Sequence, residues 1–431
     1  MIRLVYNLVW PLVLLLFLPG YLLKMFRRGG YREKFGQRLG IYGADVRSRL
    51  AGVTSTWFHA VSVGEVAIAL KLANELRKLE PNLRCALTVT TTTGFAFAMK
   101  SAARWIEVIY SPLDFWPVMR RAFSVIQPQR IILVEAEVWP NLVAEARQRK
   151  IPIALVNARL SVKSEKRFRR FRAFVAPIFR LLDLICIQEE ADADRWEELG
   201  VSHSKIRHCG SIKSDPEIAH VNPAHSLSLL RDIGISATRP ILLGGSTHPG
   251  EEKMLAHAFL KARQTFADLF LIVAPRHAER VYFVRAAVEQ AGLRVAMQSA
   301  EKGLTGMVDC LIIDTTGELQ NWYPLASVVF IGKSLLAHGG QNPVEAIIAG
   351  KPVIFGPHME NFSVLARALV AEHGAVEIQS ADELAPKVVE LLRDPELGKR
   401  CVANARKVLQ PHRGATARTA AMISALRPAE N

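Results

Sequence analysis

The sequence predicts an α/β protein of two doubly wound, Rossmann-like domains preceded by an N-terminal membrane-anchor helix. An uncharged segment runs from Leu4 to Leu23, strand-like and helical segments then alternate twice, and a looser stretch from Ser211 to Arg239 separates the two alternations. Such alternation is typical of parallel sheets covered by helices on both faces. The predicted parts are an anchor over 1–24, an N-terminal domain over 25–215, a C-terminal domain over 216–410, and a helix and tail over 411–431 that pack back on the N-terminal domain.

The segment from Leu4 to Leu23 is long enough to span a bilayer, because about 20 residues at ~1.5 Å rise match a hydrocarbon core of about 30 Å. A cleaved signal peptide is the alternative, but Pro19 to Leu23 lacks a small-x-small cleavage motif. Arg3 precedes the segment and a basic cluster follows it, so the positive-inside rule keeps the remaining chain in the cytoplasm. Pro11 and Pro19 interrupt a straight span, which leaves a monotopic insertion as an alternative. The basic cluster is Lys24, Arg27, Arg28, Arg32 and Lys34.

Apolar runs of strand length mark both domains. The first set is Ser55 to Ala60, Cys85 to Thr90, Ile106 to Tyr110, Arg130 to Glu135, Ile153 to Asn157 and Leu184 to Gln188. The second set is Pro240 to Gly244, Leu269 to Ala274, Leu311 to Asp314, Val328 to Ile331 and Pro352 to Phe355. Ligands of doubly wound sheets bind beyond the carboxyl ends of the strands. The loops after these strands are therefore the segments in which to look for chemistry.

The composition points to an anionic partner. The formal net charge of +15 and a pI near 9.8 favour a nucleic acid, a membrane surface or phosphorylated substrates, and charge alone does not choose among them. Half of the residues are hydrophobic, which excludes a disordered chain. The cysteines form no C-x-x-C pair, which indicates a reducing compartment. They are Cys85, Cys186, Cys209, Cys310 and Cys401.

The stretch from Gly339 to Glu345 is the most informative in the chain. A Gly-rich turn feeds a helix start there, and helix N-termini offer backbone N–H groups and a positive dipole end to an anion. Glu345 lies where a carboxylate can accept hydrogen bonds from ribose hydroxyls. This combination suggests a nucleotide-sugar site, with an ordinary strand–turn–helix as the alternative.

Two loops of the first domain carry carboxylates. In the loop after Ala60, Ser62 can cap a helix, Gly64 permits close approach of a ligand, and Glu65 falls in the first turn as either a capping-box carboxylate or a ligand-facing base. Glu135 and Glu137 directly follow the apolar strand from Ile131 to Val134. Because two unpaired carboxylates are costly to bury, they should face solvent, a cation or a ligand.

Three further loops, in the second domain, also follow predicted strands and carry polar, glycine or charged residues. The segment from Gly244 to Glu252 reads as a helix start whose double Gly hints at a ligand. Ala274 to His277 places an Arg beside a His, which suits a phosphate. The segment Asp314 to Leu319 ends the next strand. So many polar strand-end loops on one sheet favour a binding site.

A basic helix from Lys163 to Arg180 has two open interpretations. It is either a surface for phospholipid or phosphorylated lipid, or a core-packed helix with a basic outer face. Its apolar stripe is Phe168, Phe171, Val175 and Ile178, and its basic residues are Lys166, Arg167, Arg169, Arg170 and Arg172. The remaining candidates are interpreted as structural or solvated, namely Asp192, Asp194, His203, His208 and Cys209.

With these residues assembled, the sequence resembles 3-deoxy-D-manno-octulosonic acid (Kdo) transferases, inverting glycosyltransferases of lipopolysaccharide biosynthesis with the two-domain GT-B fold. The resemblance runs along nearly the whole chain, and it implies that the N-terminal domain over 25–215 binds the acceptor and the C-terminal domain over 216–410 binds the nucleotide sugar. It is carried by the anchor, Phe35 to Gly40, Ser62 to Glu65, Trp139 to Asn141, Val156 to Ser161, and the loops at Ser246, Pro275, Gly317 and Asn342.

The resemblance implies a role for individual residues. Glu65 matches the general base, and Glu135 and Lys213 match positions assigned to transition-state stabilisation. The segments that hold the cytidine monophosphate (CMP) are matched by Pro275, Arg276, Thr316, Gly317, Glu318, Asn342, Pro343, Val344 and Glu345. No cofactor and no metal ion is implied. The chain departs from the family pattern at Ala136, Ser211, Ser214 and Gln341.

The implied reaction moves Kdo from CMP-Kdo to a phosphorylated lipid A precursor at the cytoplasmic side of the bacterial inner membrane, with the N-terminal segment in contact with phospholipids. Both substrates are anionic, which suits the basic chain. The alternatives are another GT-B glycosyltransferase or a nucleotide-sugar epimerase with a different donor, and a catalytically inactive membrane-bound relative. Nucleic-acid binding is not expected, because the basic residues carry no recognisable reader motif.

Overall fold

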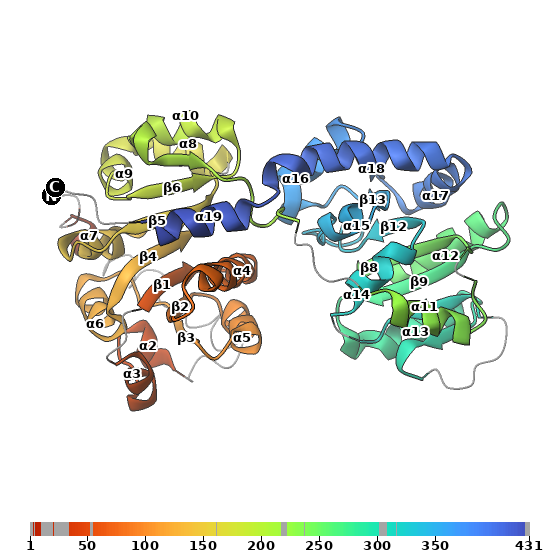
Figure 1. Cartoon of the computed structure of the whole chain (residues 1–431), viewed down its shortest axis with the longest axis horizontal. Coiled ribbons are helices and arrows are strands. Elements are labelled where there is room, and N and C mark those ends of the chain that lie inside the picture. Colours follow the sequence, from red (N-terminus) through yellow and green to blue (C-terminus); the bar gives the residue numbers. More distant parts are fainter. Residues whose placement is uncertain are drawn as a thin grey trace. The chain divides into compact units, whose positions relative to one another are not determined.

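A computed structural model describes residues 34–51, 55–160, 162–216, 222–236, 238–300, 308–315 and 317–426, together with 3, 5–9 and 20. The chain divides into two compact units. Unit 1 comprises Met1–Asp215 and Gly414–Asn431, and unit 2 comprises Pro216–Arg413. Each unit contains one seven-stranded parallel sheet surrounded by helices (Figure 1), so the predicted parallel α/β architecture is confirmed. The assignment of acceptor binding to one domain and nucleotide binding to the other stays a prediction.

Unit 1 has the strand order β3-β2-β1-β4-β5-β6-β7. Its strands are β1 (Ser55–Ala60), β2 (Cys85–Val89), β3 (Ile106–Tyr110), β4 (Pro128–Val134), β5 (Ile153–Ala158), β6 (Leu184–Ile187) and β7 (Ile206–His208). Its helices are α2 (Phe35–Arg38), α3 (Ala44–Leu50), α4 (Val63–Leu79), α5 (Thr92–Ser101), α6 (Trp116–Ile126), α7 (Pro140–Gln148), α8 (Val162–Arg170), α9 (Arg172–Phe179), α10 (Ala193–Glu198) and α19 (Ala415–Ser424).

Unit 2 has the strand order β10-β11-β9-β8-β12-β13-β14. Its strands are β8 (Ile241–Thr247), β9 (Phe270–Pro275), β10 (Val295–Met297), β11 (Cys310–Ile312), β12 (Val328–Ile331), β13 (Val353–Phe355) and β14 (Val376–Glu377). Its helices are α11 (Ala224–Asp232), α12 (Glu251–Arg263), α13 (Val281–Gln290), α14 (Leu319–Trp322), α15 (Val344–Ile348), α16 (Ser363–Ala371), α17 (Leu384–Arg393) and α18 (Pro395–Leu409).

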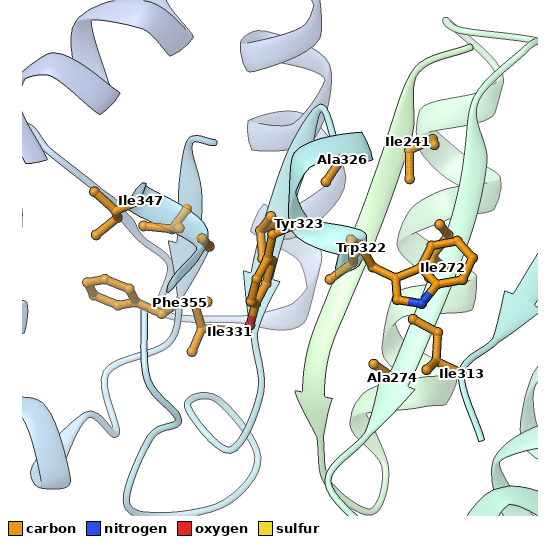
Figure 2. Packing of buried hydrophobic residues seen from close by; sticks show 14 of the residues in the cluster. Ile241, Ile272, Ala274, Ile313, Trp322, Tyr323, Ala326, Ile331, Ile347 and Phe355 are labelled. Carbon is orange, nitrogen blue, oxygen red and sulfur yellow. The ribbon is translucent and has the colours of Figure 1, made fainter. Parts of the chain in front are cut away.

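Each sheet has a hydrophobic core on both faces. Along β1, Trp57 enters the core on one face and its neighbour Phe58 enters the core on the other, as the two-residue repeat of a strand requires. Figure 2 shows one core of unit 2, in which Trp322 and Tyr323 pack among aliphatic residues of the sheet. Burial on both faces explains why the central strands read as continuous apolar runs.

The strands β7, β10 and β14 were not predicted from the sequence. All three lie at a sheet edge, and two of them keep exposed residues, as the pattern of His208 and Glu377 illustrates. Strands of two or three residues are too short to show the apolar run that marked the longer strands.

The C-terminal helix α19 packs on α4 of unit 1. Its start is held by Asp215, whose carboxylate accepts hydrogen bonds from the backbone N–H groups of Gly414 and Thr416, each at 2.7 Å. Gly414 has a φ of 75°, which suits a residue without a Cβ. Asp215 therefore satisfies N–H groups that a helix start leaves without an internal partner.

The predicted anchor over 1–24 lies mostly outside the described residues. Among the residues that are described, no helix is both long enough and apolar enough to cross a membrane.

Candidate active site

The order of strands defines where ligands should bind in each unit. In unit 1 the order reverses between β1 and β4, and in unit 2 it reverses between β8 and β12. At such a switch point the loops leave neighbouring strands in opposite directions and open a crevice at the carboxyl edge of the sheet. The loop with Glu65 follows β1 and the loop with Glu135 follows β4, so two predicted catalytic residues flank the switch point of unit 1.

Glu65 is held tightly at the start of α4. Its Oε2 accepts a hydrogen bond from the Val61 N–H at 2.8 Å, and its Oε1 accepts one from the Ser62 hydroxyl at 2.8 Å. The Ser62 Oγ also accepts from the Glu65 N–H at 3.4 Å and caps the helix. Glu65 is therefore a capping-box carboxylate, as one alternative predicted. The same hydrogen bonds orient this carboxylate, which was also predicted to act as a base.

Burial of Glu65 changes its chemistry. The residue is only 8% exposed, and burial raises the pKa of its carboxyl to about 7, against the lowering effect of the two hydrogen bonds and with a further increase from Glu135 and Glu137. A buried carboxyl gains proton affinity because the charged form is poorly solvated. Glu65 thus has the proton affinity expected of a general base near neutral pH.

Lys213 and Glu135 lie near Glu65. The Lys213 Nζ is 4.0 Å from the position that a Cβ on Gly64 would occupy, which places the ammonium beside the first turn of α4. Burial lowers the pKa of Lys213, while Glu135 and Glu65 oppose that change. Glu135 has a φ of 61°, an uncommon value for a residue with a side chain. All three predicted catalytic residues are therefore brought together at this sheet edge.

Asn157 was not predicted as a site residue, although it positions the turn that carries Lys213. It is the penultimate residue of β5, with a φ of 51°, and is 1% exposed. Its Oδ1 accepts a hydrogen bond from the Ile212 N–H at 2.9 Å, and its Nδ2 has no partner among the described residues. The segment from Val156 to Ser161, which contains Asn157, was among those that carry the family resemblance, but no role was predicted for this residue.

In unit 2 the loops after β8 and β12 are joined by one carboxylate. Glu251 is fully buried and accepts hydrogen bonds from the N–H groups of His248, Lys333 and Ser334. Such a carboxylate fixes both loops at the switch point of this sheet.

Cationic side chains gather around His248. Burial lowers the pKa of His248 to about 4, with further lowering from Lys333, His277, Arg280 and Arg276 in that order. The imidazole is therefore neutral at pH 7 and surrounded by positive charge. A site of this kind attracts a phosphate or a carboxylate. Arg276 was predicted as a site residue, whereas His248 and Lys333 were not.

The predicted donor-binding residues occupy three loops of unit 2. Pro275 ends β9, and Arg276 next to it donates its backbone N–H to Thr247 at 3.0 Å. Glu318 accepts a hydrogen bond from the Thr315 hydroxyl at 3.0 Å, and Gly317 has a φ of 89°. Thr316 lies outside the described residues.

The segment from Asn342 to Glu345 begins α15. The Asn342 Oδ1 accepts a hydrogen bond from the Val344 N–H at 3.0 Å, Pro343 precedes the first helical residue, and Glu345 lies in the first turn. Glu345 is close enough to contribute to the raised pKa of buried Tyr323. The helix spans only five residues, so its dipole is small.

The basic run from Lys163 to Arg180 shows the core packing of one interpretation, whereas the lipid-surface interpretation stays a prediction. It forms α8 and α9, and Phe168, Val175 and Ile178 pack against the core. Phe171 and Phe174 are instead 50% and 55% exposed. The residues interpreted as structural have ordinary partners: Asp192 pairs with Arg195 at 2.9 Å, and His203 pairs with Glu197.

Two parallel-sheet α/β units with charged loops at both switch points define the GT-B-like class, and comparison with known proteins narrows it. A solved UDP-GlcNAc 2-epimerase of Neisseria meningitidis bound to UDP-GlcNAc has a TM-score of 0.53 and 12% identity, with 86% of this chain and 100% of that chain covered. At this identity the likeness shows the fold alone.

The sequence relatives identify the family. The family model described as 3-deoxy-D-manno-octulosonic-acid transferase (kdotransferase) matches residues 33–216, and that described as glycosyl transferases group 1 matches residues 294–408. The chain is 34% identical over 404 residues to a 3-deoxy-D-manno-octulosonic acid transferase of Bordetella pertussis, covering 91% of this chain and 92% of the relative. It is 30% identical over 404 residues to one of Haemophilus influenzae, covering 92% of each. The chain belongs to the Kdo transferase family and is a glycosyltransferase.

Proposed function

We propose that this Kdo transferase takes Kdo from CMP-Kdo and transfers it to a hydroxyl group of a lipid A precursor, lipid IVA, with inversion at the anomeric carbon and without a metal ion. The observation that carries the proposal is Glu65, a carboxyl group with a pKa raised to about 7 at the carboxyl edge of the sheet, near Lys213. A group of this pKa is substantially deprotonated at neutral pH and still accepts a proton from a reacting hydroxyl.

In the proposed step, the acceptor oxygen bonds to the anomeric carbon of Kdo while its proton passes to Glu65. The bond between that carbon and the CMP phosphate oxygen breaks, and its electron pair leaves with CMP. One displacement inverts the configuration at the carbon. Glu135 and Lys213 are proposed to stabilise the charge that develops in the transition state, and their proximity to Glu65 supports this role.

The donor is proposed to bind in unit 2. CMP-Kdo carries a phosphate and a sugar carboxylate, and the side chains of Lys333, Arg280 and Arg276 are the cations that lower the pKa of His248. Arg280 is partly compensated by buried Glu252, at 3.1 Å. We propose that these side chains stabilise the negative charge of the departing CMP, because preorganised cations can stabilise a leaving phosphate as a metal ion does.

The membrane is proposed to hold both the enzyme and its acceptor. The uncharged segment from Leu4 to Leu23 supports an inner-membrane anchor with the two units on the cytoplasmic side. Two exposed aromatic residues support a second contact with anionic lipid: Phe171, between α8 and α9, and Phe174, on α9, which follow the basic residues of α8. Cell fractionation and protease protection in spheroplasts test this proposal, and recovery of the full chain in the soluble fraction would contradict it.

Product analysis tests the transfer reaction directly. The purified wild type, Glu65→Gln and the control Glu75→Gln would each be incubated with freshly generated CMP-Kdo and lipid IVA, and the lipid would be weighed by mass spectrometry. Glu75 lies on the same helix in an exposed ion pair with Lys78. We expect Kdo-sized mass increments with the wild type and the control, and almost none with Glu65→Gln.

The other outcomes distinguish the alternatives. An unchanged lipid together with tight CMP binding would mean a different acceptor. Tighter binding of uridine than of cytidine nucleotides would favour another donor or an epimerase. Full transfer by Glu65→Gln would remove Glu65 from the role of base.

A further inference from the structure

Three side chains capable of binding a metal meet on the surface of unit 2, outside the residues proposed for transfer. His338 lies in the loop after β12, and His358 and Glu360 lie in the loop after β13. Their ligand atoms are all within 4.8 Å of one another, and they form the one group of three or more His, Cys, Asp or Glu of this kind in the part of the chain that the structure describes.

The two imidazoles converge on one carboxylate oxygen. The His338 Nδ1 is 3.0 Å and the His358 Nδ1 is 3.6 Å from the Glu360 Oε1, and the two rings have centroids 4.0 Å apart. A simple surface ion pair needs only one histidine and contributes little. Two protonated imidazoles at this separation would repel each other, whereas one shared cation would bind both rings in their neutral form.

The distances suit a tetrahedral zinc ion. Zinc binds imidazole nitrogen and carboxylate oxygen at about 2.0–2.2 Å, so two ligand atoms on a tetrahedral ion lie about 3.4 Å apart. The observed 3.0 Å and 3.6 Å bracket that value. Three protein ligands would leave one coordination position for water.

The backbone around the ligands is already fixed. The second oxygen of Glu360, Oε2, accepts a hydrogen bond from the Gly339 N–H at 2.6 Å, which leaves Oε1 directed at the histidines. The loops are further joined by hydrogen bonds from the His358 N–H to the Ser334 carbonyl at 2.9 Å and from the Asn361 N–H to the Gly339 carbonyl at 2.8 Å. Contacts that orient a ligand in this way raise metal affinity.

We propose that His338, His358 and Glu360 form a zinc site that cross-links the loop after β12 to the loop after β13. The site goes beyond the transfer reaction and takes no part in its chemistry. Its effect is local: the bound ion holds the turn at Gly339 and Gly340, which immediately precedes the segment from Gln341 to Glu345. The site was not predicted from the sequence, because its histidines come from two separate loops.

The test is direct metal binding to the full-length protein in detergent, without a histidine tag and after treatment with a chelator. Zn²⁺ binding would be measured by isothermal titration calorimetry, and Co²⁺ would report the coordination geometry by its visible absorption. The variants are His338→Ala, His358→Ala and Glu360→Gln, and the control is His257→Ala, which removes an exposed histidine from α12. The assay contains neither donor nor acceptor, so its result is independent of the proposed transfer.

We expect one Zn²⁺ per chain, a Co²⁺ spectrum of low-coordinate type, and an increase in Tm with added Zn²⁺ for the wild type and the control. Each of the three site variants should bind at least about tenfold more weakly, with a metal-free Tm equal to that of the wild type. Equal affinity in the wild type and His338→Ala, or no stoichiometric binding by the wild type, would overturn the proposal. If an alanine variant lowers the metal-free Tm, the zinc affinity of Glu360→Gln decides the test, because its side-chain oxygen can still accept the hydrogen bond from the Gly339 N–H.

Discussion

Ser62 and Glu65 hold each other in place: the Ser62 hydroxyl donates to the Glu65 carboxylate at 2.8 Å, and the Ser62 Oγ accepts from the Glu65 N–H at 3.4 Å. The same contacts that begin α4 therefore fix the orientation of the proposed base. Glu65 can take part in the cap and still act as a catalytic group, because each carboxylate oxygen that accepts one hydrogen bond retains a lone pair for a substrate proton.

The rate of transfer should rise with pH through about 7. Glu65 must be deprotonated to accept the hydroxyl proton, and its pKa is raised to about 7. Values of kcat/KM for the lipid acceptor, obtained from initial rates between pH 5.5 and 8.5, would show this rise. Glu65→Gln should lower kcat by roughly 10²–10⁴-fold. A flat profile, with binding of both substrates unchanged across the range, would contradict the assignment.

The raised pKa of Glu65 should also lower stability at high pH. A carboxyl with a folded pKa of about 7 in place of 4.5 binds its proton more tightly in the folded state, so folding becomes less favourable as pH rises between these values. Glu65→Gln removes this cost and should raise the free energy of unfolding by about 2–3 kcal/mol at pH 8.5.

Urea denaturation of the variant at two pH values would measure the effect. At pH 5 the difference between wild type and variant should shrink to under about 1 kcal/mol, because Glu65 is then mostly protonated in the folded state. Glu75→Gln should show no such pH-dependent gain. An equal difference at both pH values would mean that Glu65 acts through packing alone.

The sequence was most informative where burial leaves a clear pattern. The central strands were recognised because residues such as Trp57 and Phe58 fill opposite cores, and the carboxyl ends of those strands led to Glu65 and Glu135. The edge strands β7, β10 and β14 were missed because each spans only two or three residues. His248 and Gln341 lie 93 residues apart in the chain but 3.2 Å apart between their side-chain nitrogens, and no periodicity predicts such a pair.

Asn157 illustrates the same limit in unit 1. Its hydrogen bond from Ile212 joins the end of β5 to a turn 55 residues further along the chain. Asn157→Ala should cost about 1–3 kcal/mol of stability, because it leaves the buried Ile212 N–H unsatisfied, and should lower kcat by displacing Lys213. Asn157→Gly loses the same hydrogen bond but relieves the backbone strain, so it should be more stable than Asn157→Ala by about 1 kcal/mol.

Urea denaturation and initial rates of both Asn157 variants would separate the two effects. Equal stability of the alanine and glycine variants would show that the backbone at φ 51° carries no strain. Unchanged kcat in both would show that the turn keeps Lys213 in position without Asn157.

Arg276→Ala should weaken the binding of CMP by about 10–100-fold, because a charge-assisted hydrogen bond to phosphate contributes about 1.5–3 kcal/mol. The expected loss is larger at low salt, since Arg276 is exposed and salt screens such charges. Calorimetric titration of CMP at two ionic strengths would measure both effects. The control is Arg285→Ala, which removes an exposed guanidinium paired with Glu289 at 2.7 Å on α13 and should leave CMP affinity unchanged. If both variants lost affinity equally, the effect would reflect the general positive field of unit 2, and Arg276 would not contact the donor phosphate.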